Sequence, residues 1–288
     1  MSFKDEYLKT PPGPARNALV LKALTAQGPP KNLVPVTVPG PGGTKITYRV
    51  LPDYLMVDGI RVSLPPAMAQ QLLASWGMSL PTAKMSKQIY NAADTKIRAT
   101  PLSSSGYTGA DGKHYSAKDV VSDRINASDA SVHYNELTDK ELAGVKNPGL
   151  IAGHGKDILE PLGDGKDVSL GGWQGKDGQE LQPWTIAHRG EAANHTEYAL
   201  WIRPVSNEGV TVTTPDGKTV PMTMGKLRGM QNLGQAVAGD TLAKQYVAKS
   251  APMTGAKPGN GGAAAPSASK ARLSLLQRID SILDQFEI

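Results

Sequence analysis

The chain has 288 residues and a formal net charge of +5, which is enough length for one large domain or two modest ones. Hydrophobic residues make up only 39%, while glycine occurs 31 times and proline 22 times, so we expect a loop-rich protein with many short strands. The absence of cysteine excludes disulfides, thiolate catalysis and cysteine-ligated metals, and the scattered basic residues predict no specific nucleic-acid binding.

Residues 1–29 are expected to form an N-terminal arm that contains one short helix. Ala15 to Gln27 has helical composition, and it ends at Gly28-Pro29-Pro30, where the prolines lack amide donors and stop the helix. The first residues lack the uninterrupted apolar stretch of a secretory signal, and no later stretch reaches the ~18 apolar residues that cross a bilayer. We therefore expect no signal peptide and no membrane span, and a location in a virion or similar particle, or in the cytoplasm before release.

Residues 30–225 predict an α+β main domain built from antiparallel β hairpins with inserted helices. Alternating β-branched and polar residues at 34–38 and 45–50 indicate two strands around a Pro/Gly turn. Residues 55–57 and 60–64 flank Asp58-Gly59, a dipeptide whose positive φ values suit a two-residue hairpin turn. The same dipeptide recurs at Asp111-Gly112, Asp177-Gly178 and Asp216-Gly217. Repeated turns of this type between strand-like runs favour an antiparallel sheet.

Three helices are predicted between the hairpins, at residues 65–78, 81–97 and 128–145. The second has Met85 and Ile89 on one face, at the spacing of an α-helix. The first begins with prolines and the third with capping residues, and both have a glycine near their end.

Beyond the main domain, residues 226–250 predict a helical extension and residues 251–269 a linker. The linker is rich in Gly, Ala, Pro and Ser, and it cannot bury enough apolar surface to offset its ordering entropy. Residues 270–288 predict an amphipathic helix, and its apolar stripe consists of Leu275, Leu276, Ile279, Ile282, Leu283 and Phe286. An isolated helix of about 18 residues is marginally stable in water, so this one needs a partner surface.

Several surfaces are open to this C-terminal helix. It folds back onto its own domain, docks onto another protein subunit, or pairs with a second copy as a short coiled coil. Acidic residues on its polar face make a membrane surface the least suitable alternative. We favour association with other protein subunits, with the six apolar residues as docking residues.

The segment LIAGHGKDI contains the first candidate catalytic residues. A strand at residues 150–151 leads into Gly153-His154-Gly155, where the glycines allow a sharp turn and would leave the imidazole accessible. Asp157 follows three residues after His154. This pair has the residue types of an oriented general base, or of half a metal site.

A second polar group lies in the stretch AHRGEAANHTEYALW. If residues 196–202 form a strand, His195 and Glu197 point to the same face and share a pocket. With His154 they supply two histidines and one carboxylate, which suits a divalent metal such as zinc bound by His154 and His195. The alternative is that these histidines are hydrogen-bonded structural residues, since the chain has no HExxH, GxSxG or Walker motif.

Trp173 and Trp184 bracket the predicted hairpin GGWQGKDGQELQPW. Paired aromatics of this kind either stack on sugar rings or close a small core. Together with Tyr198, they are the candidate ligand-binding residues.

The motifs GPARNAL, LPTAKM, LIAGHGKDI, GGWQGKDGQELQPW and NHTEYALWIR follow one another in the order seen in a family of uncharacterised bacterial and bacteriophage proteins. The chain resembles this family over residues 13–205, most closely in LPTAKM and NHTEYA. Some members of the family are joined to peptidoglycan-binding repeats. The resemblance implies an association with the bacterial envelope or with phage particles, and it implies no known reaction.

Two positions depart from the family's pattern. Trp173 matches an aromatic residue that relatives commonly follow with histidine, but the next residue here is Gln174. Tyr198 also matches, whereas Ala199-Leu200 replaces the His-Gly pair that often follows the tyrosine. Glutamine is not an acid, a base or a good zinc ligand, so the resemblance implies a chain that keeps the fold without the chemistry.

Three functions follow as hypotheses. The first is a structural or assembly component of a phage, of a phage-like particle or of the bacterial envelope, anchored through the C-terminal helix. The second is a peptidoglycan hydrolase of the cell wall that uses His154, Asp157, His195 and Glu197. The third is a non-catalytic peptidoglycan-binding module.

Overall fold

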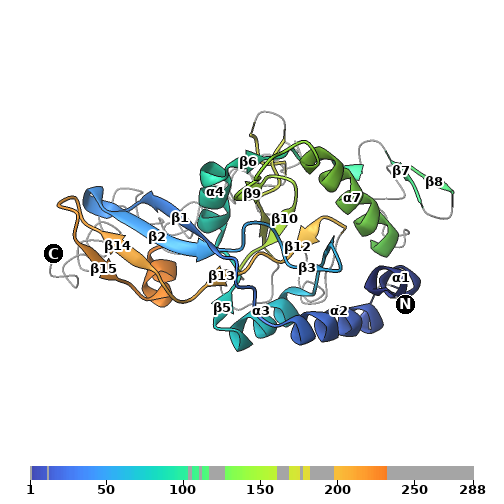
Figure 1. The fold of residues 1–288 in the computed structure, drawn as a ribbon, viewed down its shortest axis with the longest axis horizontal. Helices are drawn as coiled ribbons and strands as arrows, with labels where there is room; N and C mark the ends of the chain where they lie inside the picture. Colours follow the sequence, from blue (N-terminus) through green and yellow to red (C-terminus); the bar gives the residue numbers. More distant parts are fainter. Residues whose placement is uncertain are drawn as a thin grey trace, which may run out of the picture. The chain divides into compact units, whose positions relative to one another are not determined.

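The computed structural model describes residues 2–11, 13–102, 106–109, 112–116, 127–160, 169–175, 178–181 and 198–231 (Figure 1). The chain divides into two units, Met1–Thr241 and Leu242–Ile288, and all described residues belong to the first. They form a mixed α+β fold with antiparallel sheets, as the sequence predicted. The predicted linker at 251–269 and the predicted docking helix at 270–288 lie outside the described residues.

Two helices precede the first strand. α1 (Phe3–Lys9) begins with a capping box, in which the Ser2 hydroxyl accepts from the Asp5 amide and the Asp5 carboxylate accepts from the Ser2 amide. α2 (Pro14–Gln27) confirms the predicted helix, and it ends at Gly28, whose φ is 75°. The sequence pattern did not predict α1, because 7 residues are too few to show a helical period.

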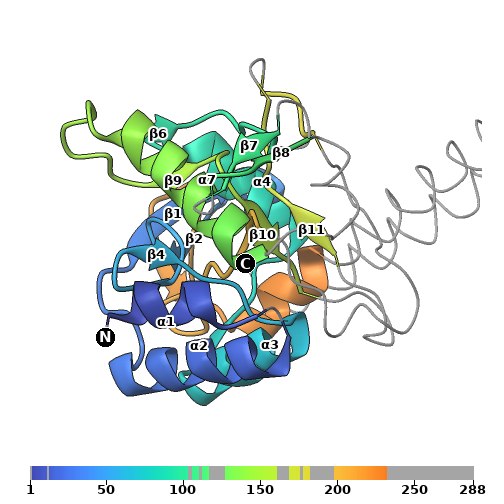
Figure 2. The ribbon, with the colours of Figure 1, turned by 90° about the vertical axis from the view of Figure 1, so that its right-hand side faces the viewer.

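These two helices belong to an apolar core shared with the main domain. Tyr7, Val20 and Leu24 are buried in the same cluster as residues of α3 (Pro66–Ser75) and of the strands that follow α2. Figure 2 shows α1, α2 and α3 gathered on one side of the described residues. Residues 1–29 therefore contribute to the core that supports the site described below.

The largest sheet has the strand order β15-β14-β2-β13-β5, and β1 pairs with β2 beside this path. Its strands are β1 (Val34–Pro39), β2 (Lys45–Val50), β5 (Met78–Ser79), β13 (Val205–Ser206), β14 (Thr211–Thr213) and β15 (Thr219–Pro221). β1 and β2 confirm the strands predicted at 34–38 and 45–50, and the 3-10 turn η1 (Pro41–Gly43) lies between them. Buried and more exposed residues alternate along β1, β2 and β14. The buried residues of these strands form one apolar cluster with Met85 and Ile89 of α4 (Ala83–Ala92).

The Asp-Gly dipeptides at 58–59 and 216–217 lie at hairpin turns, which confirms the prediction for the two dipeptides that the structure describes in full. β3 (Met56–Val57) and β4 (Ile60–Arg61) pair antiparallel around Asp58 and Gly59, whose φ values are 51° and 76°. The residues that flank the other three dipeptides also pair antiparallel. These pairs are β7 (Tyr107–Thr108) with β8 (His114–Tyr115), Gln174 with Glu180, and β14 with β15.

The three helices predicted between the hairpins are α3, α4 and α7 (Ala127–Leu142). The Thr82 hydroxyl caps α4 by accepting from the Met85 amide, and Met85 and Ile89 are buried on the predicted face. None of the helices in the described part of the chain is long and apolar enough to cross a membrane.

A further helical segment begins at residue 224 and includes residue 231, the last that the structure describes, so it overlaps the extension predicted at 226–250. Gln231 is held by Thr82, whose hydroxyl donates to its side-chain oxygen at 2.6 Å. Gln231 in turn donates to Gln88 of α4 at 3.3 Å. The end of the described chain is thus bonded to the first turns of α4.

Among the strands that the structure describes, two pairings are parallel, which the hairpin pattern did not predict. β6 (Thr95–Lys96) pairs with β9 (Ile151–Ala152), and β10 (Lys156–Ile158) pairs with β12 (Leu200–Trp201). β10 also pairs antiparallel with β11 (Leu170–Gly171). These pairings join distant parts of the sequence, and they place the turn between β9 and β10 against the core.

Replacement of Leu24 tests whether α2 is part of the core. Leu24 is 0% exposed, so we expect Leu24→Ala to lower the free energy of unfolding by about 2–5 kcal/mol in urea denaturation. Lys22→Ala, at an exposed position of the same helix, should change it by at most about 0.5 kcal/mol. Equal small effects of the two substitutions would mean that the domain does not depend on α2.

Candidate functional site: a buried ion network

The turn at residues 153–155 carries the predicted catalytic histidine. Gly153 has a φ of 98°, and a Cβ at this position would collide with the carbonyl oxygen of Ile97. A Cβ on Gly155 would collide with the rings of Trp201 and Tyr54. The two glycines thus allow the sharp turn, as predicted, and the close approach of the backbone to the core.

The imidazole of His154 is buried, so the prediction that it is accessible is wrong. His154 is 1% exposed, because the turn folds inward against Tyr54 and Trp201, whose ring centroids lie 5.2 and 5.8 Å from the imidazole. Its Nε2 lies 3.1 Å from Oδ1 of Asp53, and its Nδ1 has no hydrogen-bond partner among the described residues. The carboxylate that orients His154 is therefore Asp53, and not Asp157.

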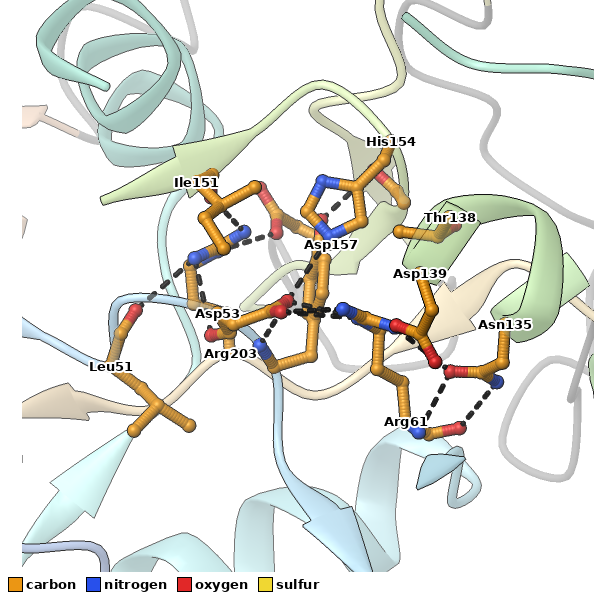
Figure 3. Close-up of polar contacts among 12 residues, drawn as sticks. Leu51, Asp53, Arg61, Asn135, Thr138, Asp139, Ile151, His154, Asp157 and Arg203 are labelled. Carbon is orange, nitrogen blue, oxygen red and sulfur yellow. Dashed lines mark hydrogen bonds and ion pairs between the residues drawn. The ribbon is translucent and has the colours of Figure 1, made fainter. Parts of the chain in front are cut away.

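Arg61 on β4 binds the same carboxylate from another direction (Figure 3). One terminal nitrogen lies 2.7 Å from Oδ2 of Asp53, and Nε lies 3.1 and 3.2 Å from the two carboxylate oxygens. The other terminal nitrogen lies 2.8 Å from Asp139 and 3.2 Å from Asn135, both on α7. Arg61 is 1% exposed, so its charge is matched inside the protein by a forked pair.

Arg203, which follows β12, forms the second ion pair of the network. Its Nε lies 3.2 Å from Oδ1 of Asp157, and its terminal nitrogens donate to the carbonyls of Leu51, Asp53 and Ile151 at 3.0 to 3.2 Å. The other oxygen of Asp157 accepts from the Ser86 hydroxyl. Asp157 is 2% exposed, and both of its oxygens are bonded within the protein.

Burial and pairing act in opposite directions on the charges of this network. Burial alone would raise the pKa of Asp53, but contacts with His154 and Arg61 lower it well below its usual value. Burial lowers the pKa of His154 and outweighs the opposite effect of Asp53, so the imidazole is neutral near pH 7. The charge that keeps Asp53 ionised at that pH is therefore that of Arg61. Burial also opposes the charge of Arg61 itself, yet Asp53 and Asp139 raise its pKa.

Aromatic rings surround the network, and Trp173 is one of them. Trp173 is 4% exposed, and its Nε1 donates to the Tyr134 hydroxyl at 2.9 Å. Lys156 Nζ lies 4.5 Å from the centroid of the Trp173 ring. The centroids of the Trp173 and Tyr198 rings are 6.4 Å apart. Sugar stacking requires an exposed ring face, so in the described structure Trp173 closes a small core.

Three of the predicted site residues, His195, Glu197 and Trp184, lie outside the described residues, and their roles stay predictions. The structure brings His154 and Asp157 into one network through Asp53 and Arg203. Within the part of residues 2–231 that the structure describes, no group of three or more His, Asp or Glu side chains is arranged to hold a metal ion.

The sequence pattern did not identify Asp53, Arg61 or Arg203. Each arginine stands in an otherwise apolar run, in GIRVSL and in ALWIRPV, where a single charge is unusual. That placement is the signal that could have found them, because a charge in a buried strand needs a partner. The position of the partner is not local, since Asp53 and His154 are 101 residues apart.

Removal of one charge from this network should be costly. Arg61→Met leaves the largely buried Asp53 carboxylate, which is 14% exposed, without its counter-charge. We therefore expect a loss of about 3–5 kcal/mol of unfolding free energy, measured by urea denaturation at neutral pH. The control is Lys4→Met, which removes an exposed pair between Lys4 and Glu136 that is 3.0 Å long and should cost at most about 1 kcal/mol. A loss as small as that of the control would show that the network does not hold the fold.

Comparison of the chain with protein-family models, with curated proteins and with solved structures returned no match.

Proposed function

We infer that this protein is a non-catalytic structural component of a phage-like particle or of the bacterial envelope. The observation that supports this proposal is that His154 and Asp157, two residues of the predicted catalytic set, are only 1% and 2% exposed. Their side chains are bonded to Asp53, Arg203 and Ser86, so neither is presented to a polymeric substrate. A buried network of this kind stabilises a fold, and cleavage of a cell-wall polymer requires an accessible acid or base.

The two positions at which the chain departs from the family that it resembles lie beside this network. Gln174 is 4% exposed, and its backbone N–H donates to the carbonyl of Gly153, the residue before His154. Leu200 of β12 is 0% exposed, and it belongs to the same apolar cluster as Val20 and Leu24 of α2. Neither glutamine nor leucine has an acidic or basic side chain. Their presence at these buried positions supports a protein that has the fold of the family but not its catalytic groups.

The anchoring part of the proposal depends on the sequence of residues 251–288. A Gly/Ala/Pro/Ser linker followed by an amphipathic helix is typical of a tethered docking peptide. The described fold supplies a firm starting point for such a tether, since Gln231 is 2% exposed and is bonded to Thr82.

Substitutions on the two sides of the predicted C-terminal helix test the anchor. The double variant Ile279→Asp/Leu283→Asp places charge in the apolar stripe, and we expect it to abolish co-purification with the assembled particle. Arg278→Asp changes the net charge by the same amount on the other side of the helix, so it should leave incorporation unchanged. Deletion of residues 251–288 should reproduce the effect of the double variant.

Circular dichroism of each variant is the control for folding of the main domain. Incorporation of the double variant or of the deleted chain at the wild-type level would refute the proposal. Binding of the wild type to insoluble peptidoglycan in a pull-down, independent of residues 251–288, would instead favour a cell-wall binding module.

A second candidate function, a peptidoglycan hydrolase, is favoured by one feature of His154. Asp53 holds Nε2 while Nδ1 has no hydrogen-bond partner among the described residues, and this is the arrangement of an oriented imidazole base. Loss of turbidity of purified cell walls tests it. Lysis by the wild type, together with its loss in His154→Ala and in His195→Ala, would replace the structural proposal, whereas we expect no lysis by any of the three proteins.

A further inference from the structure

The outer face of the largest sheet carries threonines on adjacent strands. On β1, β2, β14 and β15, the residues of this face are exposed or partly exposed. The register places Thr37 of β1 and Thr211 of β14 on either side of Thr47 of β2. Thr213 of β14 lies opposite Thr219 of β15. Figure 1 shows the four strands side by side, so the five threonines form one contiguous patch, which we call the threonine face.

Hydrogen bonds between neighbouring strands order the hydroxyls of the threonine face. The hydroxyl oxygens of Thr37 and Thr47 are 2.8 Å apart, and those of Thr213 and Thr219 are 3.0 Å apart. A hydroxyl has one hydrogen to donate and two lone pairs that accept, so each bonded pair keeps one hydrogen and three lone pairs. The face therefore offers more acceptors than donors, and it suits a ligand that brings hydroxyl donors.

Two cations stand beside the threonines without a carboxylate partner. Lys45 and Arg49 are exposed residues of β2, and they lie on the same face as Thr47 because each is two residues away from it. Neither side chain forms an ion pair with a described residue. Arg49 donates to the carbonyl of Leu33 at 2.7 Å, which leaves its charge uncompensated.

Acidic residues are absent from these four strands. Glu208 and Asp216 lie in the connections before and after β14, and Asp216 has Lys218 of its own turn beside it. The threonine face therefore combines hydroxyls with positive charge, and this combination attracts an anionic ligand.

The spacing of the two cations indicates a linear ligand. Lys45 and Arg49 are four residues apart on one strand, which corresponds to about 13 Å at the rise of a β-strand. Thr47 lies midway between them, with Thr37 and Thr211 beside it. A ligand that contacts both cations must cross this row of hydroxyls, so its anionic groups must be joined by segments that carry hydroxyls.

We propose that the threonine face, together with Lys45 and Arg49, binds a linear polymer of polyol units joined by phosphodiesters. Nucleic acid is a less suitable polyanion, because the outer residues of these strands include no aromatic ring on which bases could stack, and the DNA backbone brings no hydroxyl. A lipid surface is also less suitable, because the face has no large apolar side chain to insert. The proposal goes beyond the structural role and uses no residue of the C-terminal anchor, so either can fail alone.

Calorimetric titration of the full-length protein with purified poly(glycerol phosphate) tests the charges of the site. We expect binding that weakens as the salt concentration rises. Lys45→Gln/Arg49→Gln should weaken it by about tenfold, since two contacts between opposite charges are lost. Lys22→Gln/Lys140→Gln removes the same charge at exposed positions of α2 and α7, and it should leave the affinity unchanged. Absence of binding, or equal affinities of the two double variants, would overturn the proposal.

Removal of hydroxyls tests the threonines separately from the charges. Thr37→Val/Thr47→Val keeps the β-branched shape on the exposed face, so the fold should be retained, as circular dichroism would show. We expect this variant to bind poly(glycerol phosphate) more weakly than the wild type. Its affinity for inorganic polyphosphate, which has no hydroxyl-bearing segment, should be unchanged. Equal losses for both polymers, or no loss for either, would refute a role of the hydroxyls.

Competing ligands decide which anion the face recognises. Duplex DNA, an RNA oligonucleotide and phosphatidylglycerol vesicles should each bind more weakly than poly(glycerol phosphate) at equal phosphate concentration. Tighter binding of any of the three that is lost in Lys45→Gln/Arg49→Gln would overturn the assignment of a polyol phosphate polymer.

Discussion

The forked ion pair between Arg61 and Asp53 is the interaction on which the rest of the described fold depends. Arg61 is 1% exposed, and transfer of an unpaired guanidinium from water into such a position costs on the order of several kcal/mol. The carboxylate must therefore lie within bonding distance of the guanidinium, and this requirement fixes the segment between β2 and β3 beside the hairpin of β3 and β4. His154 and α7 are bonded to the same two groups, so segments up to 101 residues apart share one centre.

This centre also explains why catalytic residue types need not indicate catalysis. A histidine, two aspartates and two arginines lie close together, but each is used to compensate another inside the protein. Pairing with aspartates favours the charged state of the arginines, whereas burial favours the neutral state of the histidine. Together these effects favour a single rigid arrangement. A rigid domain suits the proposed structural role, because a scaffold must hold the parts bound to it at fixed relative positions.

Much of the fold could be predicted from the sequence, since its signals are local. Asp-Gly turns mark their own hairpins, and Met85 and Ile89 mark the buried face of α4. The parallel pairings could not be predicted, because they join strands that no turn connects. The site was found only in part for the same reason. Asp157 is near His154 in the sequence, whereas Asp53 is near it in space, and a glycine-flanked turn gives no sign of whether it faces solvent or core.

β1 has a further consequence, which concerns the contact of one sheet with another. Among the described residues β1 pairs with β2 alone, so its outer side is an open sheet edge. Pro35 and Pro39 lie on this strand and carry no amide hydrogen. A strand from a neighbouring molecule would meet an incomplete row of donors there, which discourages runaway stacking of sheets in a crowded setting. The two prolines of β1 thus limit backbone pairing at this edge, and they leave side-chain contacts unaffected.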